Sequence, residues 1–474
     1  MAQNLPLELI EHVTDECLPD IEALRSSSLI SKLWTIPAQK RLFSCVSIFP
    51  ELVRAVPSIP PNSEDYSGYP SPQYILDGSI DKFKEHLEDA PHLADFVQEL
   101  HLGMPKMPPL ELFYAREKKV PDGAFTGANE IISRFRNMGS VSLSFAEDYD
   151  WAKLAFMHQS LCHALSSSML CYLKIGPVTF ATQSQFNNLL DSCVSLEVLI
   201  INNVKIKEAT ENETGQKTVE KLRPSLKELT VHTDLPSLIQ IIEAFVSPSS
   251  SVDVSCLLRL SLWCKYSNAQ RHHPMGPVCS LLRKARCLQH LQLFACLTGP
   301  LYQYVNPASL QTFYVCDQLG QPSTTLTWLV KSFEAESDSE SGLALTELSI
   351  DICQSNAYSS ENLSADSTAW AHLGATIEQH ARQFRSVTVR GKGYRPFYMM
   401  DRSIEGVLQS EDLRDALGMR MREDVVVRFV QYLTQDDVLY SGSHCEDFYE
   451  REWEPTLDDW LSDWEVKDDT EKED

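Results

Sequence analysis

The chain has 474 residues, a formal net charge of −25 at pH 7 and a hydrophobic fraction of 43%. This length exceeds one ordinary compact core, so we expect several domains or an array of repeats, and the charge argues against nucleic acid or a membrane surface as a partner. No apolar run approaches the ~20 residues needed to cross a bilayer, and the N-terminus lacks a signal pattern, so we expect a cytoplasmic or nuclear protein.

The first fifty residues predict three short helices. Pro6 fits the first turn of a helix, where its missing N–H does no harm, and Leu18-Pro19 ends that helix. Apolar residues recur at helical spacing in three stretches, which are Leu9, Ile10, Val13 and Cys17, then Leu24, Leu29 and Leu33 with Trp34 beside them, then Ala38, Leu42 and Phe43.

The same stretch carries a family resemblance. It contains Leu-Pro-x-Glu-Leu at 5–9, Leu-Ile-Ser-Lys-x-Trp at 29–34 and Arg-Leu-Phe at 41–43. In order and spacing these segments resemble the F-box over roughly residues 4–48, in particular that of F-box proteins with a repeat region from mushroom-forming fungi. The resemblance implies docking on the Skp adaptor of a cullin–RING ubiquitin ligase through Leu5, Pro6, Leu9, Ile10, Leu29, Ile30 and Trp34.

The other interpretation is that these side chains form only the core of the helical unit. So short a unit cannot bury two apolar stripes internally, because small domains bury too little of their surface. We therefore favour docking.

A proline-rich stretch follows, and behind it lies an internal repeat. Residues 54–75 hold five prolines among Ser, Asn and Gly, which is typical of a semi-rigid linker. The repeat is a triplet of apolar residues at positions i, i+3 and i+5. Its ten copies are Val97-Leu100-Leu102, Met138-Val141-Leu143, Leu170-Leu173-Ile175, Leu196-Leu199-Ile201, Leu226-Leu229-Val231, Leu257-Leu260-Leu262, Leu288-Leu291-Leu293, Leu310-Phe313-Val315, Leu345-Leu348-Ile350 and Phe384-Val387-Val389.

This triplet is the strand segment of a leucine-rich repeat. Helical patterns lie between several triplets, namely Phe186-Leu189-Leu190-Cys193, Leu238-Ile241-Ile242-Phe245 and Val278-Leu281-Leu282. We therefore expect an α/β fold, an irregular leucine-rich-repeat solenoid with parallel strands inside and helices outside. The middle residues of successive triplets are 22 to 41 residues apart, and this irregularity puts the regularity of the curvature in doubt.

The chain after Val389 shows no further triplet. Helical spacing in 404–440 predicts a terminal cap. Residues 446–474 contain fourteen acidic and three basic residues with three tryptophans, which is typical of a tail without stable structure. The expected domains are a helical F-box-like unit at 1–50, a linker at 51–78, the repeats at 79–400, a helical cap at 401–445 and the tail at 446–474.

The sequence displays no pattern typical of catalysis or of a cofactor. There is no glycine-rich phosphate loop, no G-x-S-x-G and no C-x-x-C. The most metal-like group is His272-His273 with Cys264 and Cys279, but its spacing fits no zinc motif. We therefore expect a protein that is not an enzyme, with no metal, no cofactor and reduced thiols.

Alternation along the strands predicts which residues lie on the exposed face of the sheet. If Leu260 and Leu262 face the core, Trp263 faces outward, and the same rule exposes Phe294, Tyr314 and His232. Adjacent strands lie about 4.8 Å apart, so Trp263, Phe294 and Tyr314 would form one aromatic patch. We expect this patch to bind a protein substrate; the alternatives are aromatic stacking on a crowded face, or cover by the C-terminal tail.

The favoured function is that of a substrate-recognition adaptor in a ubiquitin ligase, with the F-box-like unit on a Skp-type adaptor and the repeats holding a protein substrate. One alternative is a repeat-based interaction scaffold with no ligase role. A third hypothesis, a hydrolase or transferase without a visible motif, predicts a pocket of clustered His, Asp, Ser or Cys side chains.

Overall fold

The computed structural model describes the chain from residue 6 to residue 432, with gaps. The described residues are 6–16, 21–49, 52–56, 76–103, 125–145, 149–208, 223–248, 250–265, 276–294, 305, 309–318, 330, 344–354, 371–375, 386–393 and 426–432.

Three helices open the described chain, as expected, but the second predicted stripe is divided between two of them, because Ser31 is extended and separates Leu29 from Leu33 and Trp34. They are α1 (Leu7–Glu16), α2 (Ile21–Ile30) and α3 (Lys32–Leu42). The carbonyl of Pro6 accepts hydrogen bonds from the amides of Leu9 and Ile10, at 3.1 and 3.2 Å, and so begins α1. The side chain of Thr35 donates to the carbonyls of Ser28 and Ser31, which holds the start of α3 against the end of α2.

The rest of the described chain alternates strands with helices. The strands are β1 (Cys45–Phe49), β2 (Leu52–Val56), β3 (Leu76–Ser79), β4 (Glu99–Gly103), β5 (Ser140–Ser144), β6 (Tyr172–Ile175), β7 (Val178–Thr182), β8 (Val198–Asn202), β9 (Val204–Glu208), β10 (Glu228–Asp234), β11 (Arg259–Lys265), β12 (His290–Phe294), β13 (Thr312–Gln318), β14 (Glu347–Gln354), β15 (Ser386–Gly393) and β16 (Val426–Tyr432). The helices are α4 (Ile80–Asp89), η3 (Pro91–Phe96), α6 (Ala128–Ile132), η4 (Trp151–Met157), α7 (His158–Leu165), α8 (Gln183–Asp191), α9 (Leu235–Val246) and α10 (Gly276–Lys284), of which η3 and η4 are 3-10 helices.

These strands form one long sheet in which the spatial order follows the order along the chain from β4 onward, while β1 lies between β4 and β2. The fourteen-stranded sheet of the described residues runs β16-β15-β14-β13-β12-β11-β10-β8-β6-β5-β4-β1-β2-β3. Every neighbouring pair from β16 to β1 is parallel, whereas β2 is antiparallel to both of its neighbours, β1 and β3. Strands β7 and β9 pair separately. The expected α/β class with a parallel sheet is therefore confirmed.

The register of the sheet aligns the predicted triplets. Leu100 is the partner of Val141, and the chain of partners continues through the middle residue of each triplet to Val387. The first nine triplets are buried. A parallel strand whose apolar side chains all share one face is held in register by that face, because a slip of one residue would expose them.

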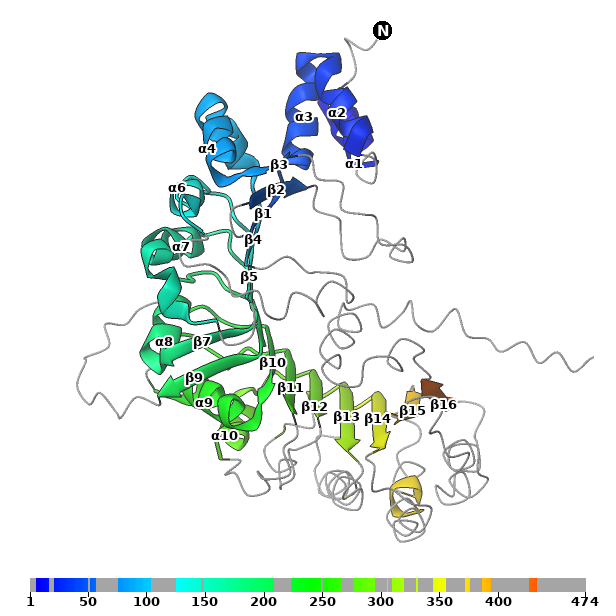
Figure 1. Cartoon of the computed structure of the whole chain (residues 1–474). Helices are drawn as coiled ribbons and strands as arrows, with labels where there is room; N and C mark the ends of the chain where they lie inside the picture. Colours follow the sequence, from blue (N-terminus) through cyan, green and yellow to red (C-terminus); the bar gives the residue numbers. More distant parts are fainter. Residues whose placement is uncertain are drawn as a thin grey trace, which may run out of the picture.

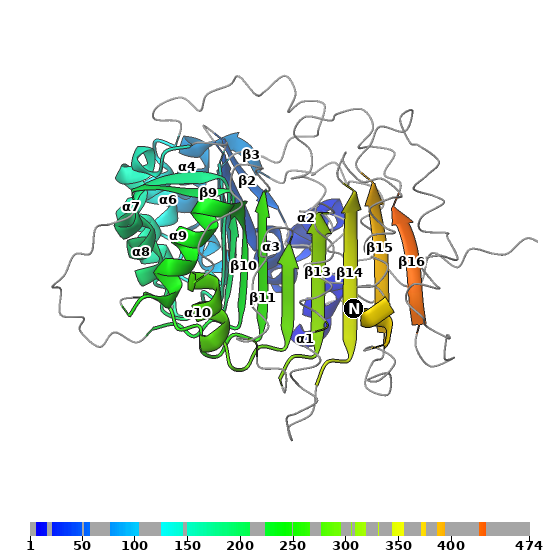
Figure 2. The same ribbon diagram turned by 90° about the horizontal axis from the view of Figure 1, so that it is seen from below.

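Helices cover the buried face of the sheet. In Figure 1, α4 and α6 to α10 lie on the outer side of a bent row of strands, and Figure 2 shows the row from below. The predicted helical patterns lie in α8, α9 and α10, whose apolar side chains are buried. One continuous hydrophobic core runs from Leu24 and Leu42 of the N-terminal helices to Leu373.

Three stretches have a secondary structure other than the one predicted for them. Residues 52–56 and 76–78, assigned to the linker, lie in β2 and β3, which extend the sheet beyond β1. Residues 45–49, assigned to the helical unit, form β1, because Phe43, Val46 and Ile48 repeat the triplet spacing.

The third correction concerns the C-terminal cap. The run from Val426 to Tyr432, expected in a helical cap, forms β16, since its β-branched residues favour a further strand on β15. The rest of 401–445 and the tail at 446–474 lie outside the described residues.

Candidate interaction surfaces

Exposed apolar side chains are concentrated on the three N-terminal helices. Ten large hydrophobic residues of the described chain are exposed, and the seven on α1 to α3, called here the helical patch, are Leu7, Leu9, Val13, Leu29, Ile30, Leu33 and Ile36. Leu29 is 86% exposed and Ile30 62%. A concentration of exposed large apolar side chains in one part of a chain favours a contact surface there, because leaving them in water costs free energy.

The patch exists because the helices are too short to bury both of their apolar sides. Their inward side chains include Ile10, Leu24, Trp34, Ala38 and Leu42, all buried. Leu24 and Leu42 belong to the same hydrophobic core as the sheet, while the residues of the helical patch are exposed. An ion pair between Asp15 and Arg41 ties α1 to α3 at the edge of this unit.

The predicted adaptor-binding residues divide between the patch and the interior. Pro6, Leu9, Leu29 and Ile30 are exposed, and Leu5 lies outside the described residues. Ile10 and Trp34, which are also expected to contact the adaptor, are buried.

Four residues of the patch were missed in the sequence, namely Leu7, Val13, Leu33 and Ile36. Leu9 and Val13 are one helical turn apart in α1, whereas Leu29 lies at the end of α2 and Leu33 at the start of α3. The periodicity identified apolar residues without telling which of them point outward.

The second surface is the inner face of the sheet, opposite the helices. His232 of β10 and Trp263 of β11 are paired in register on this face, and their ring centroids lie 3.5 Å apart at an interplanar angle of 79°. Trp263 is half-buried as a result, and His232 is buried rather than exposed as expected, because the indole packs edge-on against it.

The other two predicted aromatics share this face at different positions. Tyr314 is half-buried and lies two strands from Trp263, in the cross-strand row of Gln292 rather than in that of Phe294. Phe294 is the partner of Cys316 at the end of β12, and its side chain lies outside the described ones. The structure thus brings His232 and Trp263 into contact and places Tyr314 apart from them.

A polar row crosses the same face next to these aromatics. Glu228 and Arg259 form an ion pair at 3.8 Å, and the imidazole of His290 is hydrogen-bonded to the hydroxyl of Thr312. Desolvation by burial raises the pKa of Glu228, partly offset by Arg259, and burial followed by the charge of Arg259 lowers the pKa of His290. The inner face therefore offers hydrogen-bonding groups beside an aromatic edge, a combination found at protein-binding surfaces.

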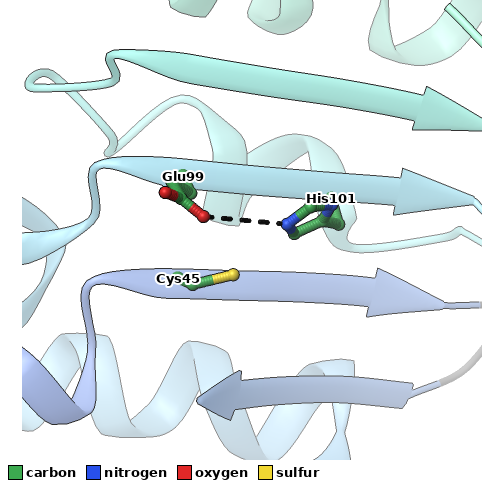
Figure 3. A group of neighbouring side chains, drawn as sticks. All are labelled: Cys45, Glu99 and His101. Atoms are coloured by element: carbon green, nitrogen blue, oxygen red, sulfur yellow. Dashed lines mark ion pairs between the residues drawn. The ribbon is translucent and has the colours of Figure 1, made fainter. Parts of the chain in front are cut away.

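A third group lies where the helical unit joins the sheet. Figure 3 shows Cys45 on β1 facing Glu99 and His101 on β4. The Sγ of Cys45, a carboxylate oxygen of Glu99 and a ring nitrogen of His101 all lie within 4.8 Å of one another, and Glu99 and His101 are 3.9 Å apart. Burial, followed by the carboxylate of Glu99, strongly raises the pKa of the Cys45 thiol, which keeps it protonated.

The metal-like residues singled out in the sequence are different ones. His272 and His273 lie outside the described residues, and so does the side chain of Cys264. Cys279 is half-buried in α10. The only group with metal-ligand spacing in the described chain is the one at Cys45.

In comparisons with known proteins, no family model matches the chain and no curated protein matches it significantly. None of the helices described above is both long and apolar enough to pass through a bilayer.

Proposed function

We propose that the protein is a substrate-recognition adaptor of a cullin–RING ubiquitin ligase. The F-box-like helices dock on a Skp-type adaptor, and the leucine-rich-repeat-like solenoid holds a protein substrate on its inner face. The protein itself performs no chemistry in this role. It raises the effective concentration of a substrate lysine near the ligase's loaded ubiquitin-conjugating enzyme.

The helical patch is the observation that supports the proposal most directly. Seven of the ten exposed large hydrophobic residues of the described chain lie on α1 to α3, in the segment that resembles the F-box. Leu9, Leu29 and Ile30 are the members of the patch that the resemblance assigns to the adaptor contact.

One observation favours the alternative of a repeat-based scaffold without a ligase role. Leu24, Leu42 and Phe43 share the hydrophobic core of the sheet, so the helices also close the N-terminal end of the array. A unit that serves only as such a cap needs no adaptor, although capping leaves the helical patch without an explanation.

Co-purification with a Skp-type adaptor separates the two functions. The test variant is Leu29→Asp/Ile30→Asp, and its matched control is Met169→Asp/Val194→Asp, which places the same charges at exposed apolar positions of the repeat region. We expect adaptor to be recovered with wild type and control, and at least about tenfold less with the test variant, because a charge at an interface anchor is desolvated on binding. Folding of each variant is checked by circular dichroism.

Two results would contradict the ligase role. If the wild-type protein recovers no adaptor, only the scaffold function remains. If the Leu29→Asp/Ile30→Asp variant recovers as much adaptor as the wild type, any adaptor contact lies elsewhere.

The proposed substrate contact is tested in the same pull-down with Trp263→Ala. Its control is Phe156→Ala, which truncates an exposed aromatic side chain on η4. We expect Trp263→Ala to retain the adaptor and lose bound proteins that the control keeps.

A further inference from the structure

Cys45, Glu99 and His101 are placed by the backbone so that their functional atoms converge. Cys45 and Glu99 are register partners on adjacent parallel strands, and His101 follows Glu99 by two residues, so alternation puts both on the face that carries Cys45. Cys45 is 4% exposed, whereas the side chains of Glu99 and His101 are 36% and 46% exposed. The group therefore has a fixed, buried sulfur and two side chains that can adjust.

These three side chains offer a thiol, a carboxylate and an imidazole, and the thiol releases its proton when a metal ion binds it as a thiolate. That set suits zinc and related divalent transition metals, and excludes magnesium and calcium, which take oxygen ligands. Zinc binds such ligands at about 2.0–2.3 Å, which places the ligand atoms of a tetrahedron roughly 3.3–3.8 Å apart. The atoms here lie within 4.8 Å of one another, so modest rotation of Glu99 and His101 closes the site without moving the strands.

We propose that Cys45, Glu99 and His101 bind one divalent transition-metal ion of the zinc class. Three protein ligands leave a fourth position for water on the side where Glu99 and His101 reach solvent. The ion would cross-link β1, which directly follows α3, to β4 and so fix the junction between the helical unit and the sheet. This inference does not depend on the proposed ligase role.

The test is a titration of the full-length protein with Co²⁺ alone, followed by absorption. Cobalt replaces zinc in such sites, and a cysteine ligand gives a thiolate-to-cobalt charge-transfer band in the near ultraviolet. We expect about one equivalent of Co²⁺ to produce this band in wild type, Cys45→Ser to abolish it and His101→Asn to weaken affinity by more than about tenfold. The controls Cys171→Ser and His86→Asn alter exposed residues outside the group and should leave both quantities unchanged.

Three results would overturn the proposal. These are a wild type without the band, a band that survives Cys45→Ser, and an affinity that His101→Asn leaves unchanged. Any of these results would mean that the thiol, the carboxylate and the imidazole lie close together without binding a metal ion. Should Cys45→Ser fail to fold, His101→Asn still decides, because His101 is exposed and its replacement removes no buried packing.

Discussion

At the scale of single residues, Gly103 at the end of β4 leaves the least room for a side chain among the described glycines. Its φ is +143°, and a Cβ built on it would lie 1.6 Å from the carbonyl oxygen of Ser144, at the end of β5. Only glycine fits, because any side chain would both strain the backbone and collide with a main-chain atom that cannot rotate away. At this position β4 ends beside the end of β5.

We expect Gly103→Ala to lower the free energy of unfolding by at least about 2 kcal/mol, from backbone strain and steric overlap together. The matched control is Gly276→Ala at the start of α10, where a Cβ meets nothing within 4 Å. That change should be neutral or stabilising by up to about 1 kcal/mol, because alanine restricts the unfolded chain. Thermal unfolding of the two variants measures the contrast, and equal melting temperatures would contradict it.

At the scale of elements, the last residue of a strand also serves as the N-cap of the next helix. The carboxylate of Asp234 at the end of β10 accepts a hydrogen bond from the amide of Ser237 at 2.9 Å and caps α9. Thr182 at the end of β7 caps α8 in the same way, and Ser79 at the end of β3 caps α4. These helices therefore follow their strands without a loop, which fixes how each helix packs on the sheet.

Removal of the cap at Asp234 tests this coupling. We expect Asp234→Ala to destabilise the protein by about 1 kcal/mol, within the range of about 0.5–2 kcal/mol for lost N-caps. Asp234→Asn should restore most of the loss, since its side-chain oxygen accepts the same hydrogen bond. Chemical denaturation of the three proteins makes the comparison. A loss in the asparagine variant as large as in the alanine variant would mean that the charge of Asp234, not the cap, stabilises α9.

Most of the sheet could be predicted from the sequence, and the exceptions have physical reasons. The triplets identified ten strands because their two alternating apolar residues point to one face and a third packs at the strand's entry. β1 was missed because its triplet overlaps the F-box-like segment. The approach of Cys45 to Glu99 and His101 could not be predicted, since it depends on which strand pairs with β1.

At the scale of the whole molecule, the described strands form a row in which each pairs only with its neighbours. Packing energy is then local, because each strand of the sheet pairs only with the adjacent ones. The continuous core joins these local contacts from the N-terminal helices to Leu373 but does not make any strand a partner of a distant one. A defect in the middle of the row should therefore have a limited reach.

Leu229→Ala measures that reach, because Leu229 is fully buried in β10. We expect a local loss of about 2–5 kcal/mol from the removed apolar volume. Amide hydrogen exchange should accelerate in β8, β10 and β11 while β4 and β5 keep their wild-type protection. Uniform acceleration along the chain would show that the array unfolds as one unit.

The single direction of the strands has a consequence for the outline of the molecule. Since β1 and β4 to β16 of the sheet run parallel in one register, their carboxyl ends share one rim. Gly103 and Gly393 are 290 residues apart in the chain, yet both leave the sheet at that rim. The carboxyl ends of adjacent strands are separated by about one strand spacing of 4.8 Å, so the order of the strands along the chain sets the order of their ends along the rim. A change in the length of the segment that follows one strand should therefore alter the rim only at the end of that strand and leave the ends of the other strands in place.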